Sequence, residues 1–205
     1  ISACLVGSEM CIRDRTKGFG PAAVDAAVGA GIVGVGENYA QELLEKAAVG
    51  AGGSVVRWHF IGTIQRNKVA GLAPHVALWQ TVDREAVADA IAAHAPGAAV
   101  LVQVNLAGDP GRTGCSWDDA AGLAERARDA GLDVRGLMGV GPAGEPEAAR
   151  PGFGRLAALA ASLGVRELSM GMTADLEVAV AEGSTMVRVG TALFGPRPRR
   201  TDLRR

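Results

Sequence analysis

The chain has 205 residues, of which 48% are hydrophobic and 21% are charged, and its formal net charge is −1. This length is enough for one domain with a sizeable core, and the composition is that of an ordinary globular protein. The near-neutral charge gives no reason to expect nucleic acid or a membrane surface as a main partner. No apolar run is long enough to span a bilayer and no signal peptide is evident, so we expect a cytoplasmic protein.

Cysteine and lysine are both scarce. The three cysteines (Cys4, Cys11 and Cys115) show no metal-ligand spacing and are too few for a disulfide framework. We therefore expect no metal site and a reducing compartment. Lysine occurs at three positions only, and the other 18 of the 21 basic residues are arginines. Five of these arginines lie in the tail 197–205, which we interpret as a solvated chain end.

The first 15 residues differ in composition from the Ala-, Gly- and Val-rich body. The stretch 4–15 reads Cys-Leu-Val-Gly-Ser-Glu-Met-Cys-Ile-Arg-Asp-Arg and resembles a translated sequencing adapter. We therefore expect residues 1–15 to be a foreign prefix on a shortened gene, with a divergent N-terminus as the alternative. The fold is then expected within residues 16–196.

From residue 16 onward, short apolar runs alternate with Ala-rich helical stretches. Strands are predicted at 31–36, 57–62, 77–82, 99–106, 134–140, 167–171 and 185–190. Helices are predicted around 20–30, 38–50, 64–72, 83–94, 116–131, 146–164 and 173–183. The apolar runs are continuous and β-branched, as in parallel strands buried on both faces. Their alternation with helices predicts βαβ units.

These seven strands require an eighth just before Lys17, at the place of the suspected prefix. Eight strands favour an α/β fold of the closed (β/α)8 TIM-barrel type over an open doubly wound sheet, whose G-x-G-x-x-G fingerprint is missing at the first turn. We expect this barrel to lack its N-terminal helix and most of its first strand. In such a barrel the functional site lies at the carboxyl ends of the strands.

Two of these strand ends predict a phosphate site. The segments 168–173 and 186–195 each read as a strand that runs into a glycine-marked turn and then a helix. A helix start offers unpaired backbone N–H groups and a positive dipole end. In (β/α)8 barrels the loops after strands 7 and 8 commonly bind phosphate.

Other strand ends carry candidate side chains, each with a structural alternative. Lys17 can form a Schiff base with an aldehyde cofactor, or it can be a solvated loop residue. His59 lies in an apolar strand as a catalytic or a hydrogen-bonded structural group. Arg188 interrupts an apolar run, so it needs either a carboxylate partner or a bound ring nitrogen. Asn38 can contact a ligand, cap the following helix in a capping box with Gln41, or do both.

Several ordered motifs together resemble one known family, the pyridoxal phosphate homeostasis proteins, which are single-domain relatives of the alanine racemase N-terminal barrel. The match covers about residues 16–196. Its motifs are Lys17, Gly-Glu-Asn-Tyr-Ala-Gln-Glu at 36–42, Trp-His-Phe-Ile-Gly at 58–62, Gln-x-Asn-Lys at 65–68, Gly-Leu-Met at 136–138, Leu-Ser-Met-Gly-Met-Thr at 168–173 and the segment 183–195.

The resemblance implies that Lys17 holds pyridoxal 5′-phosphate as an internal aldimine. It also implies that Thr173 and the backbone of Gly190 and Thr191 bind the phosphate, while Ser169 supports that turn. Members of the family bind and buffer the cofactor inside the cell and influence vitamin B6 balance, without an established catalytic activity. The resemblance further suggests a monomer, and apo-enzymes that accept the cofactor are conceivable partners.

By the same resemblance, Arg188 faces the pyridine nitrogen, and Asn38 and His59 lie near the ring. A permanently protonated arginine there disfavours pyridinium formation, which weakens the cofactor as an electron sink. Racemases of this barrel type add a tyrosine base from a second domain, whereas the single tyrosine here is Tyr39 and no residues remain for such a domain. We therefore expect a binding protein with no catalytic residues.

Two enzymatic alternatives stay open at this stage. One is a barrel enzyme that acts on a phosphorylated small molecule, with Glu37 or His59 as its general base. The other is a weak pyridoxal phosphate-dependent racemase or lyase.

Overall fold

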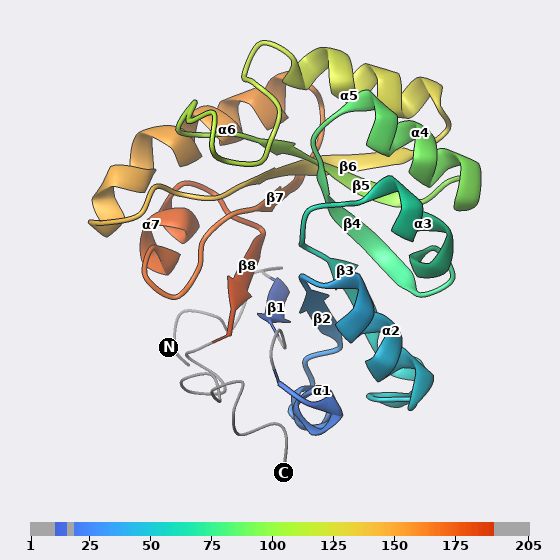
Figure 1. Cartoon of the computed structure of the whole chain (residues 1–205). Coiled ribbons are helices and arrows are strands. Elements are labelled where there is room, and N and C mark those ends of the chain that lie inside the picture. Colours follow the sequence, from blue (N-terminus) through green and yellow to red (C-terminus); the bar gives the residue numbers. More distant parts are fainter. Residues whose placement is uncertain (1–10, 16–18, 191–205) are drawn as a thin grey trace.

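The computed structural model describes residues 11–15 and 19–190 of the chain. Its eight parallel strands form a closed barrel in chain order, and helices follow the strands around the outside (Figure 1). The strands are β1 (Cys11–Arg15), β2 (Gly34–Glu37), β3 (Arg57–Phe60), β4 (Val76–Val82), β5 (Ala99–Val104), β6 (Asp133–Gly139), β7 (Glu167–Ser169) and β8 (Met186–Val189).

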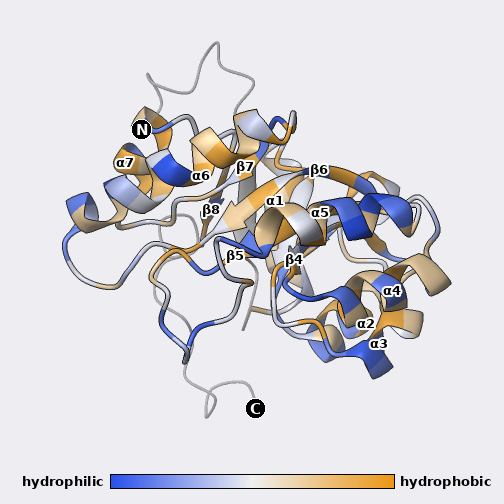
Figure 2. Cartoon of the chain, turned by 90° about the horizontal axis from the view of Figure 1, so that it is seen from above, coloured by the Kyte–Doolittle hydropathy of each residue, from blue (hydrophilic) through white to orange (hydrophobic). Residues whose placement is uncertain are grey.

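The outer layer consists of seven α-helices in the described part of the chain. They are α1 (Pro21–Gly29), α2 (Ala40–Ala48), α3 (Arg66–Leu72), α4 (Glu85–His94), α5 (Ala120–Asp129), α6 (Arg150–Ser162) and α7 (Leu176–Ala181), with short 3₁₀ turns at Gly53–Val55 and Pro146–Ala149. In Figure 2 the strand β6 carries hydrophobic stretches, whereas α3 and α5 carry hydrophilic positions. This is the layer arrangement of a (β/α)8 barrel.

The hydrophobic core has two parts, one on each face of the sheet. A large cluster packs the outward side chains of the strands against the helices, with Trp79, Phe153 and Leu43 among its largest fully buried members. A small cluster fills the barrel interior and includes Leu101 and Met186. Strands buried on both faces explain why the apolar runs in the sequence are continuous.

The seven strands predicted from the sequence are all present, and a helix lies within each predicted helical segment. Observed elements are mostly shorter than the predicted ones, because the flanking residues belong to the turns at the two ends of the barrel. The largest shortenings are at the starts of α5 and α6, which begin at Ala120 and Arg150, four residues after the predicted positions 116 and 146.

The first strand corrects one expectation. We expected most of it to be missing, but Cys11–Arg15 forms β1 and pairs with both β2 and β8, which closes the barrel. A parallel ladder is made of backbone N–H and C=O groups, so a segment of unrelated sequence can complete it. The foreign origin of residues 1–15 stays a prediction, because backbone pairing does not report where residues come from.

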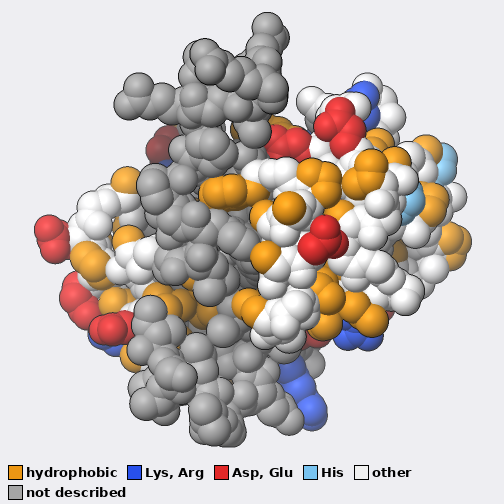
Figure 3. Space-filling model, turned by 90° about the horizontal axis from the view of Figure 1, so that it is seen from below, with side chains coloured by type: hydrophobic (Ala, Val, Ile, Leu, Met, Phe, Trp, Pro, Cys, Tyr) orange, Lys and Arg blue, Asp and Glu red, His pale blue; other side chains and the backbone are white. Residues whose placement is uncertain are grey.

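The helices and one face of the described surface can be compared with the even hydropathy of the sequence. None of the helices described here is long and apolar enough to cross a bilayer. On the face in Figure 3, the hydrophobic side chains form separate spots among polar and charged atoms.

Candidate functional site

The barrel interior changes from apolar to polar toward the carboxyl ends of the strands. On β4 and β8, Leu78 and Met186 are each followed two residues later by a polar side chain, Gln80 and Arg188. Residues two apart on a strand point to the same face, so both polar groups also point into the barrel. Gln80 and Arg188 are 0% and 3% exposed, so their polar groups need internal partners.

These partners form a hydrogen-bonded chain across the barrel. Arg188 donates to the hydroxyl of Ser169 at 2.7 Å, and that hydroxyl donates to Oε1 of Gln80 at 2.6 Å. The Gln80 amide nitrogen lies 2.8 Å from Nδ1 of His59. The serine hydroxyl thus accepts from Arg188 and donates to Gln80, whose amide N–H₂ donates to Nδ1. Nδ1 of His59 is therefore the acceptor in this arrangement.

Arg188 is also anchored to the backbone. Its guanidinium donates to the carbonyl oxygens of Ser169 at 2.7 Å and of Gly139 at 2.9 Å. Several hydrogen bonds of this kind offset part of the cost of burying a charge and fix the plane of the guanidinium. The arginine is thus held in one orientation before any ligand binds.

A cavity of about 220 Å³, here called the mouth cavity, lies above this network. Of the residues predicted from the sequence, Asn38 and Arg188 line it, whereas His59 and Ser169 act through the network below. The other lining residues are Ile61, Gly62, Thr63, Thr81, Gln103, Thr113, Met138, Val140 and Met172. A mixture of apolar walls and a few fixed polar groups is typical of a small-molecule site.

Sequence reasoning missed Thr81 and Gln103, two polar residues of the mouth cavity, and left open whether the loop of Arg112, Thr113 and Gly114 contacts a ligand; Thr113 of this loop also lines the cavity. Thr81 donates to the carbonyl oxygen of Gly62 at 2.6 Å, and the Gln103 amide donates to the Thr113 hydroxyl at 2.9 Å. Thr81 and Gln103 interrupt or end apolar strands just as Arg188 does. The same signal could therefore have found them.

Asn38 reaches the mouth cavity through a tight backbone crossing, not through a helix cap. A Cβ atom on Gly62 would lie 1.8 Å from the carbonyl oxygen of Asn38, so only glycine fits there. The capping-box alternative for Asn38 is wrong: the N-cap of α2 is Tyr39, without a side-chain cap bond, and Gln41 donates to Glu45 instead. The extended backbone that brings Asn38 past Gly62 moves the helix start one residue along the chain.

Glu37 faces the helix layer and is fully buried there. Its Oε1 accepts a hydrogen bond from Nζ of Lys46 on α2 at 2.5 Å, with side-chain exposures of 0% and 4%. A second carboxylate, Glu42, lies 3.9 Å from the same ammonium. This cluster ties α2 to β2, and it leaves Glu37 outside the lining of the mouth cavity.

The turn after β7 supports only part of the predicted phosphate cup. Gly171 adopts a φ of +92°, and the Met172 N–H donates to Oδ1 of Asp175 at 2.7 Å. Helix α7 therefore begins after this turn, and Thr173 is exposed within it. Gly190 ends the described part of the chain, and both Lys17 and Thr191 lie outside it. The phosphate and aldimine roles remain predictions.

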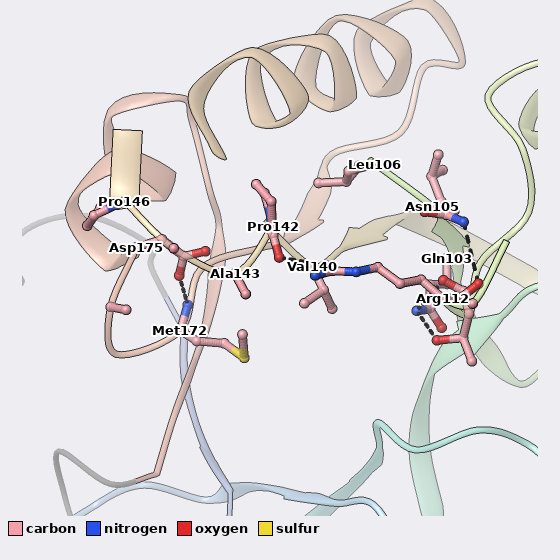
Figure 4. A pocket seen from close by; sticks show the side chains of 16 residues that line it. Gln103, Asn105, Leu106, Arg112, Val140, Pro142, Ala143, Pro146, Met172 and Asp175 are labelled. Carbon is pink, nitrogen blue, oxygen red and sulfur yellow. Dashed lines mark hydrogen bonds between the residues drawn. The ribbon is translucent and has the colours of Figure 1, made fainter. Parts of the chain in front are cut away.

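A second cavity of about 520 Å³, the side cavity, shares Gln103, Thr113, Val140 and Met172 with the mouth cavity (Figure 4). It lies between the loops after β5, β6 and β7. Arg112 crosses it and donates to the carbonyl oxygen of Gly141 at 3.0 Å. The loop that carries Arg112, Thr113 and Gly114, whose ligand contact the sequence left open, thus lines both cavities.

The base of that loop holds the one cysteine in the described ranges 11–15 and 19–190 whose side chain is placed, Cys115. Burial raises the pKa of its thiol to about 12. Its backbone N–H and C=O pair with Gln103 and Asn105 at 2.9 Å each, so the residue fastens the loop to β5. A thiol so far from ionisation is a poor nucleophile. No group of His, Cys, Asp and Glu within the described residues is arranged to hold a metal ion.

Comparison with known proteins identifies the family. The family model described as the alanine racemase N-terminal domain matches residues 15–198. The chain belongs to this family. It is 42% identical over 184 residues to the pyridoxal phosphate homeostasis protein of Pseudomonas aeruginosa, which covers 86% of this chain and 80% of that protein. The Escherichia coli K12 protein of the same name is 39% identical over 208 residues, 92% of this chain and 86% of that protein.

Solved structures agree with this assignment. PipY of Synechococcus elongatus, solved with pyridoxal phosphate bound, has a TM-score of 0.84 at 28% identity and covers 94% of this chain and 95% of its own. The alanine racemase of Clostridium difficile has a TM-score of 0.76 at 15% identity, covering 96% of this chain and 55% of its own. The second likeness concerns the fold alone. Membership of the pyridoxal phosphate homeostasis proteins, expected from the sequence motifs, is confirmed.

Proposed function

We propose that this protein binds pyridoxal 5′-phosphate and contributes to the intracellular homeostasis of that cofactor. The observation that carries the proposal is its identity of about 40% to named homeostasis proteins over most of the chain. The mouth cavity supports it, because a fixed guanidinium at its floor and polar groups on its walls suit a small planar ligand.

The proposed roles of the residues follow the family motifs. Lys17 holds the cofactor as an aldimine, while Thr173, Gly190 and Thr191 bind its phosphate. The cofactor supplies an electrophilic aldehyde and an electron-accepting ring. Arg188 faces the ring nitrogen as a donor, which keeps that nitrogen unprotonated.

The remaining predicted residues differ in how directly they act on the ring. Asn38 approaches it from the wall of the mouth cavity. His59 and Ser169 act indirectly, because their hydrogen bonds lead through Gln80 to Arg188 and fix its orientation. Ser169 is thus proposed as a support of the arginine, not of the phosphate turn.

We propose a binding protein and not an enzyme. An arginine at the ring nitrogen weakens carbanion stabilisation by the cofactor. A phosphosugar-type enzyme needs a general base at the barrel mouth. Glu37 is committed to Lys46 in the helix layer, and Nδ1 of His59 already accepts a hydrogen bond from Gln80. We further propose a cytoplasmic monomer that passes the cofactor to apo-enzymes.

Visible absorption of the purified protein tests the proposal. With pyridoxal phosphate added and excess removed, we expect an absorbance band of a protonated lysine adduct that disappears in Lys17→Ala and persists in Lys68→Arg. A colourless protein with native circular dichroism, or a band that survives Lys17→Ala unchanged, would contradict it.

A further inference from the structure

Gln80 is a buried residue to which neither the family motifs nor the lining of the mouth cavity assigns a role. Its amide is nevertheless fully used. Oε1 accepts a hydrogen bond from the Ser169 hydroxyl at 2.6 Å, while Nε2 lies 2.8 Å from Nδ1 of His59 and 3.1 Å from Sδ of Met186. An amide nitrogen carries two protons, so it has one donor for each of these two neighbours.

The sulfur atom of Met186 decides how this amide is oriented. A thioether has lone pairs but no proton, so it can accept a weak hydrogen bond from the amide N–H₂ and repels a carbonyl oxygen. Turning the amide of Gln80 over would bring Oε1 to the sulfur and N–H₂ to the Ser169 hydroxyl, which already receives a proton from Arg188. The amide nitrogen therefore faces Met186 and, with its second proton, His59.

The orientation of the amide sets the protonation of His59, which is 3% exposed. A neutral imidazole carries one proton on either ring nitrogen, and an imidazolium carries a proton on both. A proton on Nδ1 would face the amide donor of Gln80 across 2.8 Å, so both the Nδ1–H tautomer and the imidazolium are disfavoured. The guanidinium of Arg188 in the same network acts in the same direction. On the adjacent strand β2, Glu37 points to the helix layer, where it is paired with Lys46.

We propose that Gln80 is a positioning residue of the ligand site, which holds His59 as the neutral tautomer with its proton on Nε2. His59 then presents an N–H donor at Nε2, and Arg188 supplies the permanent positive charge of the network. An imidazolium would add a second positive charge there and repel the protonated lysine adduct proposed for this site. The consequence for ligand binding rests on the proposed function, whereas the tautomer of His59 does not.

Nitrogen NMR of the histidine rings in the full-length protein, before any cofactor is added, tests the tautomer directly. The chain holds three histidines, and the exposed His75 and His94 serve as controls in the same spectrum. At a pH low enough to convert both controls to imidazolium, we expect His59 to keep a bare Nδ1 and a protonated Nε2. A proton on Nδ1, or a His59 that becomes imidazolium together with the controls, would overturn the inference and leave the proposed function intact.

Substitution of Gln80 separates this role from packing. Gln80→Glu keeps the size and the acceptor for Ser169 but replaces the amide donors by a carboxylate, so Nδ1 of His59 should gain a proton. Affinity for pyridoxal phosphate, measured by absorbance titration, should fall roughly tenfold, as expected when a hydrogen bond near a charged group is lost.

The matched control is Gln103→Glu, which alters another buried glutamine of the barrel, one whose amide contacts Thr113. The ring nitrogens of His59 should be unchanged in this variant. A bare Nδ1 that persists in Gln80→Glu, or an unchanged affinity despite the shifted proton, would overturn the positioning role. A parent protein with the expected tautomer but no visible band with the cofactor would instead overturn the proposed function.

Discussion

The buried ion pair of Glu37 and Lys46 allows a direct test of how much one interaction between β2 and α2 stabilises the barrel. The variant Lys46→Met keeps most of the aliphatic stem but removes the ammonium, 2.5 Å from Oε1 of Glu37. Both side chains are at most 4% exposed, so the carboxylate would be left buried without its cation. Breaking a buried pair in this way costs about 3–5 kcal/mol of unfolding free energy. For a chain of this size that corresponds to a fall in Tm of roughly 6–20 °C.

Thermal unfolding followed by circular dichroism measures this loss. The control is Arg126→Met, which breaks a pair of similar geometry, 2.8 Å from Asp89, that is nearly half exposed on both sides. Exposed pairs contribute about 0–1 kcal/mol, so this variant should keep its Tm within a few degrees. The double variant Glu37→Leu with Lys46→Met should recover most of the lost stability, because it removes both charges of the buried pair together. A Tm for Lys46→Met equal to that of the control would refute the reasoning.

Three further predictions concern other parts of the barrel. Gly62→Ala should lower the unfolding free energy by more than about 2 kcal/mol, because its Cβ would overlap the Asn38 carbonyl. Gly122→Ala, at the third residue of α5 where a Cβ meets open space, should raise it by up to about 1 kcal/mol. Urea unfolding compares the two variants. Cys115 in the native protein should react with iodoacetamide at pH 8 at least ~100-fold more slowly than in urea, because burial raises the pKa of its thiol to about 12. Peptide mapping measures the two rates, and equal rates would contradict this. Ser169→Ala should lower the unfolding free energy in urea by about 1–3 kcal/mol and weaken cofactor binding, because the hydroxyl that accepts from Arg188 and donates to Gln80 is lost. An unchanged unfolding midpoint would argue against the network.

The order of elements could be predicted because the two faces of each strand are buried. Continuous β-branched runs and the spacing between them identify parallel strands, and this information is local in the sequence. The first strand could not be predicted in this way. Cys11–Arg15 joins the sheet through backbone groups that every residue has, so its composition carries no signal of that role.

The site was predictable where one residue breaks a pattern, and not where contacts between distant segments decide. Arg188 was found because a charge interrupts an apolar strand. The role of Gln80 was missed because it depends on Ser169 and His59, which lie 89 and 21 residues away along the chain. The wrong cap at Asn38 has the same cause: the approach of Gly62, on another strand, sets the local backbone.

The direction of the hydrogen bonds in the barrel links its structure to the proposed role. In this structure the donors run from Arg188 through Ser169 and Gln80 to Nδ1 of His59. The network begins at a guanidinium, which stays protonated and has no acceptor, so Arg188 serves as a permanent donor and not as a proton source. A permanent, buried donor holds a ligand in a fixed electrostatic environment. This property suits a protein that binds a reactive cofactor and releases it chemically unchanged.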